Sequence, residues 1–145
     1  MGLIGCAKKL TTGKAVGFDL WAAKDLSNNN PEATLANAAV EGVADRVEVE
    51  TGDITKLSFS DSAFDSVISI TVIHNIRSAA ERDNALRELI RVLKPDGRIA
   101  IFDILHASHY SEALQRARMK VRDLGRERLW LLPGRSLLAQ KPDLP

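Results

Sequence analysis

The sequence predicts an α/β protein in which helices cover a mostly parallel sheet. Strand-like and helix-like segments alternate along the chain, as they do where parallel strands are joined by helices. The stretch FDSVISITVI is a nearly continuous run of apolar and β-branched residues, which is typical of a strand buried on both faces. With 145 residues, 45% of them apolar, the chain is long enough to form one domain with a sizeable core.

The first part of the chain is predicted to alternate between helices and strands. GLIGCAKKL is interpreted as a helix that ends near TTG, and KAVGFDL as the strand that follows it. NNNPEATLANAAVEGV is predicted to be a helix, because Asn30 suits the N-cap, Pro31 the first helical position and Gly42 the end. DRVEVETGD alternates apolar and polar residues, which indicates a second strand.

A further helix and strand are predicted after FDSVISITVI. The segment SAAERDNALRELIRVL ends at KPDG, a turn that uses the chemistry of proline and glycine, and RIAIFDI then reads as a buried strand. One apolar helical face is predicted, formed by Ala79, Leu86, Leu89, Ile90 and Leu93.

The segment after Ser108 has two competing interpretations. In the first, SEALQRA is a helix, MKVRD a strand and SLLAQKP the last strand. In the second, one longer helix covers Ser111 to Leu124, because apolar residues recur there at helical spacing.

Composition excludes several classes of protein. Twenty basic and nineteen acidic residues give a net charge of +1, so no strong overall field attracts nucleic acid or an anionic membrane. Cys6 is the only cysteine, which excludes an internal disulfide and a cysteine-rich metal site. The apolar start MGLIGCA has no basic region before it and is too short for a signal peptide or a membrane span. We therefore expect a cytoplasmic protein with no membrane partner.

Acidic residues follow two of the predicted strands, at the edge of the sheet where α/β proteins bind ligands. Asp19 ends KAVGFDL, where a carboxylate can accept hydrogen bonds from a ribose diol while Leu20 and Trp21 border the attached base. Asp53 in TGDI can accept a hydrogen bond from an adenine amino group while Ile54 packs against the ring. Each aspartate is also compatible with a solvent-exposed loop or turn residue.

Histidines follow two other predicted strands. His74 in TVIHNI can act as a general base near neutral pH, or can be a helix-entry residue that faces water. His106 and His109 follow RIAIFDI without the spacing of a metal site, so we expect them to be surface residues. Asp103, within that strand, is expected either to cap a neighbouring helix or to face the pocket.

The order of these pieces resembles the class I S-adenosylmethionine-dependent methyltransferases. The resemblance is carried by GKAVGFDLW, RVEVETGDITKLSFSDSAFDSVISITVIHNI and RDNALRELIRVLKPDGRIAIFDI, and SLLAQKP is similar to the closing strand of the family. The family's usual turn has a second glycine where this chain has Asp96, a residue type that tolerates a left-handed conformation. The resemblance implies a Rossmann-like methyltransferase sheet with helices on both faces, and S-adenosyl-L-methionine as cofactor. It also implies one domain over residues 1–145, with a helix remnant (1–13), a cofactor-binding core (14–104) and a C-terminal helix with closing strands (105–145).

The resemblance also assigns roles to individual residues. Asp19 corresponds to the acid that binds the ribose hydroxyls and Asp53 to the one that binds the adenine amino group. His74 falls in the segment that lines the methionine end of the cofactor and the substrate entrance, and it is the candidate catalytic residue. The residues implied to contact the cofactor are Asp19, Leu20, Trp21, Asp53, Ile54 and Thr71.

In this family a first strand and a glycine-rich loop precede the helix that corresponds to GLIGCAKKL. Asp19 lies only 18 residues behind Met1, so the resemblance implies a chain truncated before or within these two elements. The first strand is the central one of the family's sheet, and without it the strand that ends at Asp19 and the strand at Asp65 to Ile70 lack their shared neighbour. These two strands are then expected to pair directly, to recruit another chain, or to be marginally stable.

Three functions remain open from the sequence. The first is S-adenosylmethionine-dependent methyl transfer to a small-molecule acceptor, impaired by the truncation. The second is a non-catalytic methyltransferase-like subunit, completed by a partner chain or a second copy. The third, an NAD(P)-dependent reductase, also uses an acid such as Asp19, but TGDI with LKPDGRIAI fits it poorly. TVIHNI stands where enzymes that methylate DNA bases carry an NPPY-like motif, so a nucleic acid substrate is not expected.

Overall fold

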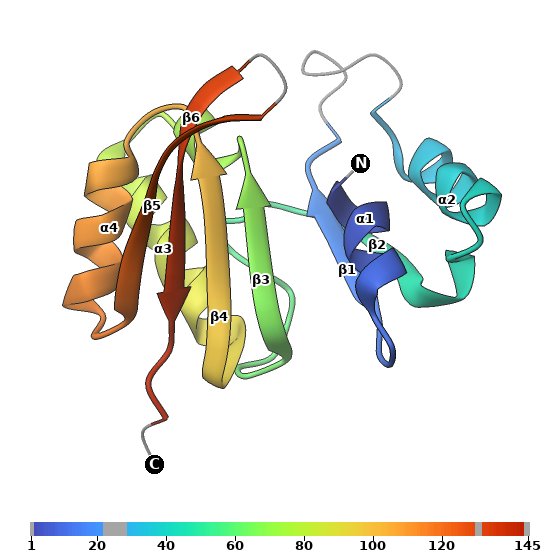
Figure 1. Cartoon of the computed structure of the whole chain (residues 1–145), viewed down its shortest axis with the longest axis horizontal. Helices are drawn as coiled ribbons and strands as arrows, with labels where there is room; N and C mark the ends of the chain where they lie inside the picture. The colour runs from blue at the N-terminus through green and yellow to red at the C-terminus, as the bar shows by residue number, and fades with distance from the viewer. Residues whose placement is uncertain (1, 22–28, 130–131, 144–145) are drawn as a thin grey trace. The chain divides into compact units, whose positions relative to one another are not determined.

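The computed structural model describes residues 2–21, 29–129 and 132–143 (Figure 1). The chain divides into two compact units, Met1–Ile54 and Thr55–Pro145. Each unit has its own sheet. That residues 1–145 form one domain therefore stays a prediction. None of the described helices is both long enough and apolar enough to cross a membrane.

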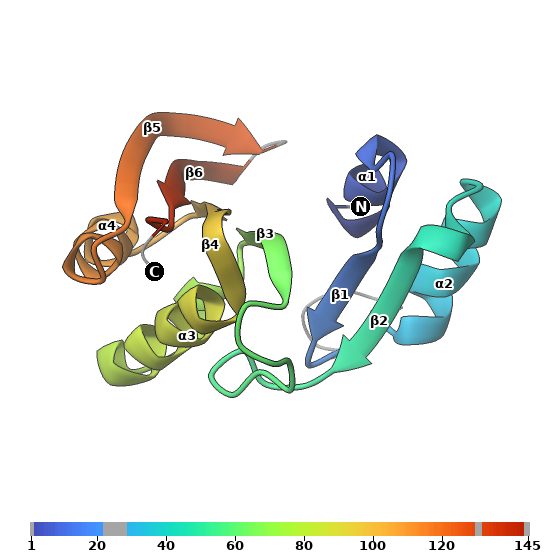
Figure 2. The same ribbon diagram turned by 90° about the horizontal axis from the view of Figure 1, so that it is seen from below.

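The first unit is built on a two-stranded parallel sheet (Figure 2). Its elements in chain order are α1 (Gly2–Lys9), β1 (Ala15–Asp19), α2 (Pro31–Val40), the short 3-10 helix η1 (Ala44–Arg46) and β2 (Val47–Thr51). The register places Ala15 opposite Val47 and Asp19 opposite Thr51. The two helices and two strands predicted for this part of the chain are confirmed.

A small apolar core joins the helices of this unit to its strands. The side chains at its centre are Ala7, Ala38, Val43 and Val47, with Leu3, Ile4, Ala15 and Val49 packed against them. Asn30 caps α2 as predicted, because its Oδ1 accepts a hydrogen bond of 2.7 Å from the backbone N–H of Ala33. Leu3 packs closely over Gly17 of β1, since a Cβ there would lie 2.6 Å from a methyl carbon of Leu3, which would have to move.

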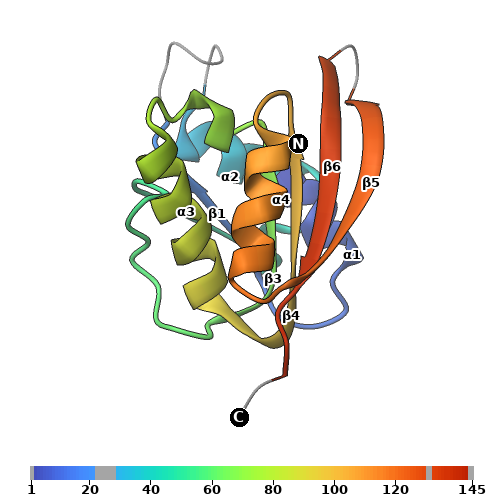
Figure 3. The ribbon, with the colours of Figure 1, turned by 90° about the vertical axis from the view of Figure 1, so that its left-hand side faces the viewer.

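The second unit is built on a four-stranded sheet in the order β3-β4-β6-β5. Strand β4 runs parallel to β3, and β6 runs antiparallel to β4 and β5. Figure 3 shows α3 and α4 side by side over one face of this sheet. The elements are β3 (Phe64–Ile70), the short 3-10 helix η2 (Ile73–Asn75), α3 (Ala79–Val92), β4 (Leu93–Asp103), α4 (Ala107–Arg116), β5 (Lys120–Leu129) and β6 (Leu132–Gln140).

The predicted KPDG turn lies inside β4, where the pairing of β4 with β3 shifts its register. Phe64 pairs with Leu93 and Ser66 with Arg98, so residues 94–97 form an insertion in β4 relative to β3. Asp96 has a φ of 60°, which confirms the left-handed conformation expected at this position.

The single helix over Ser111 to Leu124 is wrong. Helix α4 ends at Arg116, and the backbone N–H groups that follow it donate to carbonyl oxygens of its last turn, Arg118 to Gln115 at 2.8 Å. Arg118 has a φ of 61°, which stops the helix and turns the chain into β5. The apolar residues that suggested a longer helix belong to two elements. Some lie in the last turns of α4, and the others lie at and after the start of β5.

The expectation that FDSVISITVI is buried on both faces is also wrong. Only Ser69 of β3 is buried, and Ile68 is 53% exposed. Within the described residues β3 pairs with β4 alone and β1 with β2 alone, so each strand has one open edge. Direct pairing of β1 with β3, one of the three outcomes expected from the sequence, is not observed within the described residues.

Helix α3 packs through a face that differs from the predicted one at both ends. Ala79 is exposed because it is the first helical residue, and Leu93 is buried as the first residue of β4 rather than as part of the helix. The buried residues of α3 are Arg82, Ala85, Leu86, Leu89 and Val92.

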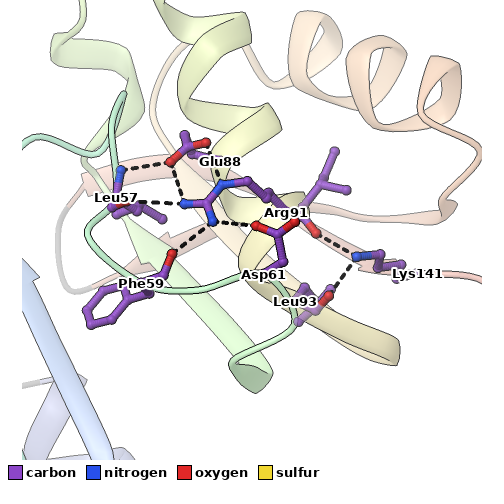
Figure 4. Close-up of polar contacts among 8 residues, drawn as sticks. Leu57, Phe59, Asp61, Glu88, Arg91, Leu93 and Lys141 are labelled. Atoms are coloured by element: carbon purple, nitrogen blue, oxygen red, sulfur yellow. Dashed lines mark hydrogen bonds and ion pairs between the residues drawn. The ribbon is translucent and has the colours of Figure 1, made fainter.

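A polar network around Arg91 fixes the loop that precedes β3 to α3 (Figure 4). The Arg91 guanidinium donates to the carbonyl oxygens of Phe59 at 2.8 Å and Leu57 at 3.1 Å, and to the Asp61 carboxylate at 2.7 Å. Glu88 accepts from Arg91 and also from the backbone N–H of Leu57, each at 2.8 Å. The loop is therefore held through its backbone rather than through an apolar contact alone.

Lys141, which follows β6, donates hydrogen bonds to backbone carbonyl groups at the end of α3 (Figure 4). Its ammonium group donates to the carbonyl oxygens of Ile90 at 2.9 Å and Leu93 at 2.7 Å. A cation near the C-terminus of a helix also interacts favourably with the helix dipole. The end of α3 is thus tied to the last strand of the sheet.

Candidate functional site

The carboxyl ends of β1 and β2 bring two predicted acids to one edge of the first sheet. Asp19 is the last residue of β1 and lies opposite Thr51, the last residue of β2. The backbone N–H of Gly52 donates to the carbonyl of Asp19 at 3.1 Å, which continues the strand pairing by one residue. Asp53 follows directly, and the Asp19 and Asp53 residues are both exposed. The structure therefore places these acids at the edge where parallel sheets bind ligands.

Asp19 retains acceptor capacity for a ligand. Its Oδ1 accepts a hydrogen bond of 2.8 Å from the backbone N–H of Trp21, while its Oδ2 has no partner among the described residues. Leu20 is 63% exposed beside it. The indole Nε1 of Trp21 is buried and lacks an acceptor in the described ranges. A buried donor without an acceptor is unusual in a protein, and a ligand with oxygen or nitrogen acceptors can satisfy it.

The backbone around Asp53 is shaped by the preceding glycine. A Cβ at Gly52 would collide with the ring of Phe18, so the TGDI loop passes close to this side chain, and a larger residue there would require the ring to move. Ile54 is half-buried beside this loop. The two predicted adenine contacts, Asp53 and Ile54, thus follow a turn whose path is fixed by packing.

In the second unit, the chain leaves β3 through a left-handed residue. Thr71 has a φ of 53°, a conformation that is rare for a β-branched side chain. Its backbone N–H donates to Phe102 at the end of β4, and its hydroxyl donates to the carbonyl of Ile70, both at 2.8 Å. The Thr71 hydroxyl is therefore engaged locally in this structure.

Left-handed residues that are not glycine follow several strands on their carboxyl side. Trp21 comes after β1, Thr71 after β3 and His106 after β4, with φ of 53°, 53° and 63°. Such conformations cost about 1–3 kcal/mol each and are found most often at functional sites. Their positions agree with a ligand-binding role for the loops at these strand ends.

His74 lies in η2 and contacts Asp103 at the end of β4. The imidazole Nδ1 is 2.5 Å from Asp103 Oδ1, and the backbone N–H of His74 donates to Asp103 Oδ2 at 3.0 Å. The His74 side chain is 15% exposed and that of Asp103 is 1% exposed. The expectation that Asp103 caps a neighbouring helix is confirmed, and the same carboxylate also holds the histidine ring.

A buried tyrosine donates to Asp103, and the charge of a buried arginine, Arg82, lowers the pKa of that tyrosine. Tyr110 of α4 is fully buried, and its hydroxyl donates to Asp103 Oδ2 at 3.3 Å. Burial raises the pKa of the Tyr110 hydroxyl, and the charge of Asp103 and the hydrogen bond to it raise that pKa further. Arg82 is nearly buried and donates to the carbonyls of Ile76 and Arg77 at 2.8 and 3.1 Å.

The two remaining histidines differ from each other. His106 is exposed and precedes α4, as expected for a surface residue. His109 is half-buried, and its Nε2 lies 2.9 Å from the Asp83 carboxylate of α3. His109 thus keeps a partly exposed side chain, and the packing of α4 on α3 brings it to an acidic partner.

Sequence reasoning did not find Tyr110 or Arg82. Tyr110 precedes Leu114 by four residues, and both are buried on one face of α4, so its position could have been inferred from helical spacing. Arg82 gives no such signal, since an arginine at the start of a helix is normally solvent-exposed.

Comparison with known families gives a match over most of the chain. Residues 4–101 match the family described as the methyltransferase domain. This range includes β1 to β3, α3 and most of β4, and with them every residue singled out for cofactor contact.

Curated relatives are longer than this chain. A methyltransferase from Streptomyces halstedii, GfsG, is 37% identical over 82 residues, which are 56% of this chain and 28% of that protein. The demethylmenaquinone methyltransferase of Mycolicibacterium paratuberculosis is 37% identical over 86 residues, or 55% of this chain and 36% of its own. The matched region thus covers about a third of these relatives.

Solved structures share the fold at low sequence identity. A putative O-methyltransferase from Nostoc punctiforme superposes with a TM-score of 0.74 at 17% identity, covering 95% of this chain and 47% of that one. An S-adenosylmethionine-dependent methyltransferase from Methanosarcina mazei gives a TM-score of 0.67 at 19% identity, covering 98% and 87%. These likenesses establish a Rossmann-like methyltransferase fold.

Proposed function

Because the chain belongs to the methyltransferase domain family, the class I S-adenosylmethionine-dependent methyltransferases, we propose that it binds S-adenosyl-L-methionine and transfers its methyl group to a small molecule. The observation that carries this proposal is the pair of acids at the ends of β1 and β2. Asp19 and Asp53 leave adjacent parallel strands at the same edge, with acceptor capacity open at Asp19 Oδ2 within the described residues.

The residues of the first unit suit the nucleoside part of this cofactor. Asp19 would accept hydrogen bonds from the ribose hydroxyls and Asp53 one from the adenine amino group. Ile54 and the exposed Leu20 offer apolar surface to the base, and the indole N–H of Trp21, which has no acceptor among the described residues, offers a donor. In the second unit, Thr71 is proposed to contribute as an acceptor, because its backbone N–H and its hydroxyl proton are both donated within the protein while its oxygen atoms keep acceptor capacity.

The bound cofactor supplies an activated methyl group attached to a sulfonium, which a nucleophile attacks in line. The contribution of the protein to such a reaction is mainly proximity and orientation. The names of similar proteins support a small acceptor, since one is a demethylmenaquinone methyltransferase and another a putative O-methyltransferase. We further propose a cytoplasmic location, with neither a membrane nor a nucleic acid as partner.

A second candidate is a methyltransferase-like subunit that a partner chain or a second copy completes. The open edges of β1 and β3 in the described residues favour it, because unpaired strand edges readily accept another strand. Sedimentation velocity over a range of concentrations distinguishes the two. If the monomer binds the cofactor, the result supports the first function. If the chain binds the cofactor only after it associates with a second copy or a partner, the result supports the second function.

Isothermal titration with S-adenosylhomocysteine tests the proposal, with NADH as the matched control ligand. We expect heat of binding with S-adenosylhomocysteine and none with NADH. Binding of NADH alone would favour a nicotinamide-dependent reductase. Failure of both ligands to bind the chain, alone or in its associated form, would contradict cofactor binding altogether.

A further inference from the structure

The hairpin of β5 and β6 extends past the last residue of β4. Asp103 ends β4 and pairs with Arg135, and residues 132–134 of β6 continue beyond this pair, where they pair within the described sheet with β5 alone. Figure 3 shows this end of the hairpin beside the point where the chain leaves β4 for α4. Since β3 and β4 are parallel and end together, the hairpin lies at the edge where open α/β sheets bind ligands.

An extra residue in β5 places two arginines on the same face as a third. β5 has one more residue than β6 between the pairs formed by Asp123 and Gly125. Side chains alternate between the two faces of a strand, so an extra residue moves every side chain beyond it to the other face. Arg126 therefore lies directly opposite Arg135 and on its face, and Arg128, two residues further along, lies on that face as well. Three guanidinium groups thus gather at the ligand edge through a bulge, a feature that is common beside active sites.

The acid on this face is already committed to one arginine. The Arg135 guanidinium donates to the Asp123 carboxylate, with Nη2 2.8 Å from Oδ2 and Nε 3.0 Å from Oδ1. Such a two-point contact is the strong geometry of an arginine–carboxylate pair. The hydrogen bond from Arg135 lowers the pKa of Asp123, so this carboxylate stays ionised and engaged at neutral pH. Asp123 therefore offsets the charge of Arg135 and leaves the charges of Arg126 and Arg128.

The other acid of the hairpin faces away from the arginines. Glu127 lies between Arg126 and Arg128 in the strand, so its side chain is on the opposite face. It accepts a hydrogen bond of 2.6 Å there from the hydroxyl of Ser136. Arg126 and Arg128 are both exposed, and neither has a hydrogen-bond or ion-pair partner among the described residues. Two guanidinium groups on one face are thus left without an acid.

The sheet gains nothing from this arrangement. Like charges directly opposite each other on neighbouring strands destabilise a sheet, and Arg126 lies opposite Arg135. A bound anion turns this repulsion into attraction, because guanidinium groups bind carboxylates and phosphates through pairs of N–H donors. The arginines are therefore suited to a ligand rather than to the strand pairing.

From these contacts we propose that Arg126 and Arg128 bind an anionic group, a carboxylate or a phosphate, carried by the methyl acceptor of this protein. Asp123 is a positioning residue that holds Arg135 beside them. The acceptor is then a small organic acid or phosphate ester whose anionic end lies on the hairpin. The net charge of the whole chain is only +1, which favours a small anion over a polyanion such as nucleic acid. The inference rests on the proposed function and adds the class of its substrate.

Nitrogen-15 NMR of the arginine side chains tests the anion site without any need for turnover. The probes are phenyl phosphate and benzoate, and benzamide is the neutral control. We expect the Nε–H signals of Arg126 and Arg128, assigned by their loss in Arg126→Gln and Arg128→Gln, to shift with either anion and not with benzamide. Tighter binding of one anion identifies the acidic group as phosphate or carboxylate. Unshifted signals of both arginines overturn the proposal.

Affinity measurements on variants assign the binding to these two arginines. Arg126→Gln and Arg128→Gln should each weaken binding of the preferred anion by about 10-fold or more, as expected for a lost charge-assisted hydrogen bond. Arg122→Gln is the matched control, because Arg122 is an exposed arginine of the same strand that precedes the extra residue and lies on the opposite face. An equal loss in Arg122→Gln, or tighter binding of a DNA duplex than of either probe at the same arginines, overturns the proposal.

Urea unfolding separates ligand binding from a structural role. Arg126→Gln removes one of two opposed charges, so its urea midpoint should equal or exceed that of the wild type. A lower midpoint would assign Arg126 to the fold and overturn its role in binding.

Titration with S-adenosylhomocysteine distinguishes the acceptor from the cofactor, which also carries a carboxylate. The double variant, Arg126→Gln with Arg128→Gln, should bind S-adenosylhomocysteine as tightly as the wild type does. We expect the wild type to methylate 4-hydroxybenzoate with a kcat/KM about 10-fold or more above that for 4-hydroxybenzamide, and the double variant to lose this preference. Weaker binding of S-adenosylhomocysteine by the double variant, or equal methylation of the acid and the amide by the wild type, overturns the assignment to the acceptor.

Failure of this inference can be distinguished from failure of the proposed function. A wild-type chain that binds S-adenosylhomocysteine but neither anion overturns the inference and leaves the proposed function intact. A chain that does not bind S-adenosylhomocysteine contradicts the proposed function, while the NMR measurement still decides whether the hairpin binds an anion.

Discussion

At the scale of single residues, Asp103 organises more of the second unit than any other described side chain in the candidate site. It caps η2, fixes the His74 ring and accepts the Tyr110 hydroxyl from α4. Tyr110→Phe removes the last of these donors without changing the packed volume. We expect the free energy of unfolding in urea to fall by about 0.5–1.5 kcal/mol, the usual net value of one hydrogen bond. A loss close to zero would mean that the 3.3 Å contact contributes nothing.

Individual site residues could be predicted from the sequence, whereas the residues that contact them could not. Asp19 and Asp53 were predicted because each ends a recognisable strand, and strand ends of a parallel sheet share an edge. The contact of His74 with Asp103 joins residues 29 positions apart and depends on the β3–β4 register, including the insertion at 94–97. Such a register is set by tertiary packing, so the pair could not be derived from local patterns.

At the scale of elements, the Arg91 network links the loop before β3 to α3, and its stability should depend on pH. The hydrogen bond from Arg91 is the main cause that holds the pKa of Glu88 below its usual value. A carboxyl whose pKa is lowered by folding stabilises the protein above its unfolded pKa, and this contribution is lost as the pH falls through the folded pKa. We expect Arg91→Ala to lower the urea midpoint at neutral pH and to reduce the further loss between about pH 5 and about pH 3.

Arg116→Ala is the control for this prediction, because Arg116 is an exposed arginine in the last turn of another helix, α4, and does not act on Glu88. It should leave the urea midpoint and its pH dependence nearly unchanged. If Arg91→Ala shows the pH dependence of the wild type, the Glu88 carboxyl is not stabilised by this network.

Elements with strong local signals were predicted and elements without them were not. Helix α2 carries an N-cap asparagine, a proline and a terminal glycine, and its bounds follow them. The end of α4 depends on a left-handed arginine at position 118, a conformation for which arginine has no preference. The exposure of β3 likewise follows from the absence of a second neighbour in the described sheet, which no residue of β3 encodes.

At the scale of the whole molecule, the open edges of β1 and β3 bear on cofactor affinity. In this family a first strand and a glycine-rich loop supply backbone donors to the amino-acid end of the cofactor. We predict that a version of this chain extended by these two elements binds S-adenosylmethionine about two to three orders of magnitude more tightly, from two or three contacts of about 1–1.5 kcal/mol each. Titration of both versions in one buffer measures the difference. Equal affinity of the two versions would mean that the amino-acid end of the cofactor gains nothing from these backbone donors.

Titration with S-adenosylhomocysteine tests most directly whether the acids at the ends of β1 and β2 hold a nucleoside cofactor. Asp19→Ala should weaken binding by about 10- to 100-fold, as expected for charge-assisted hydrogen bonds to the ribose, and Asp53→Ala by less. Asp45→Ala is the control, since Asp45 is an exposed acid that precedes β2 at its opposite end. Affinity that is lost in the first two variants and kept in the third supports the account, and equal affinity in all three would contradict it.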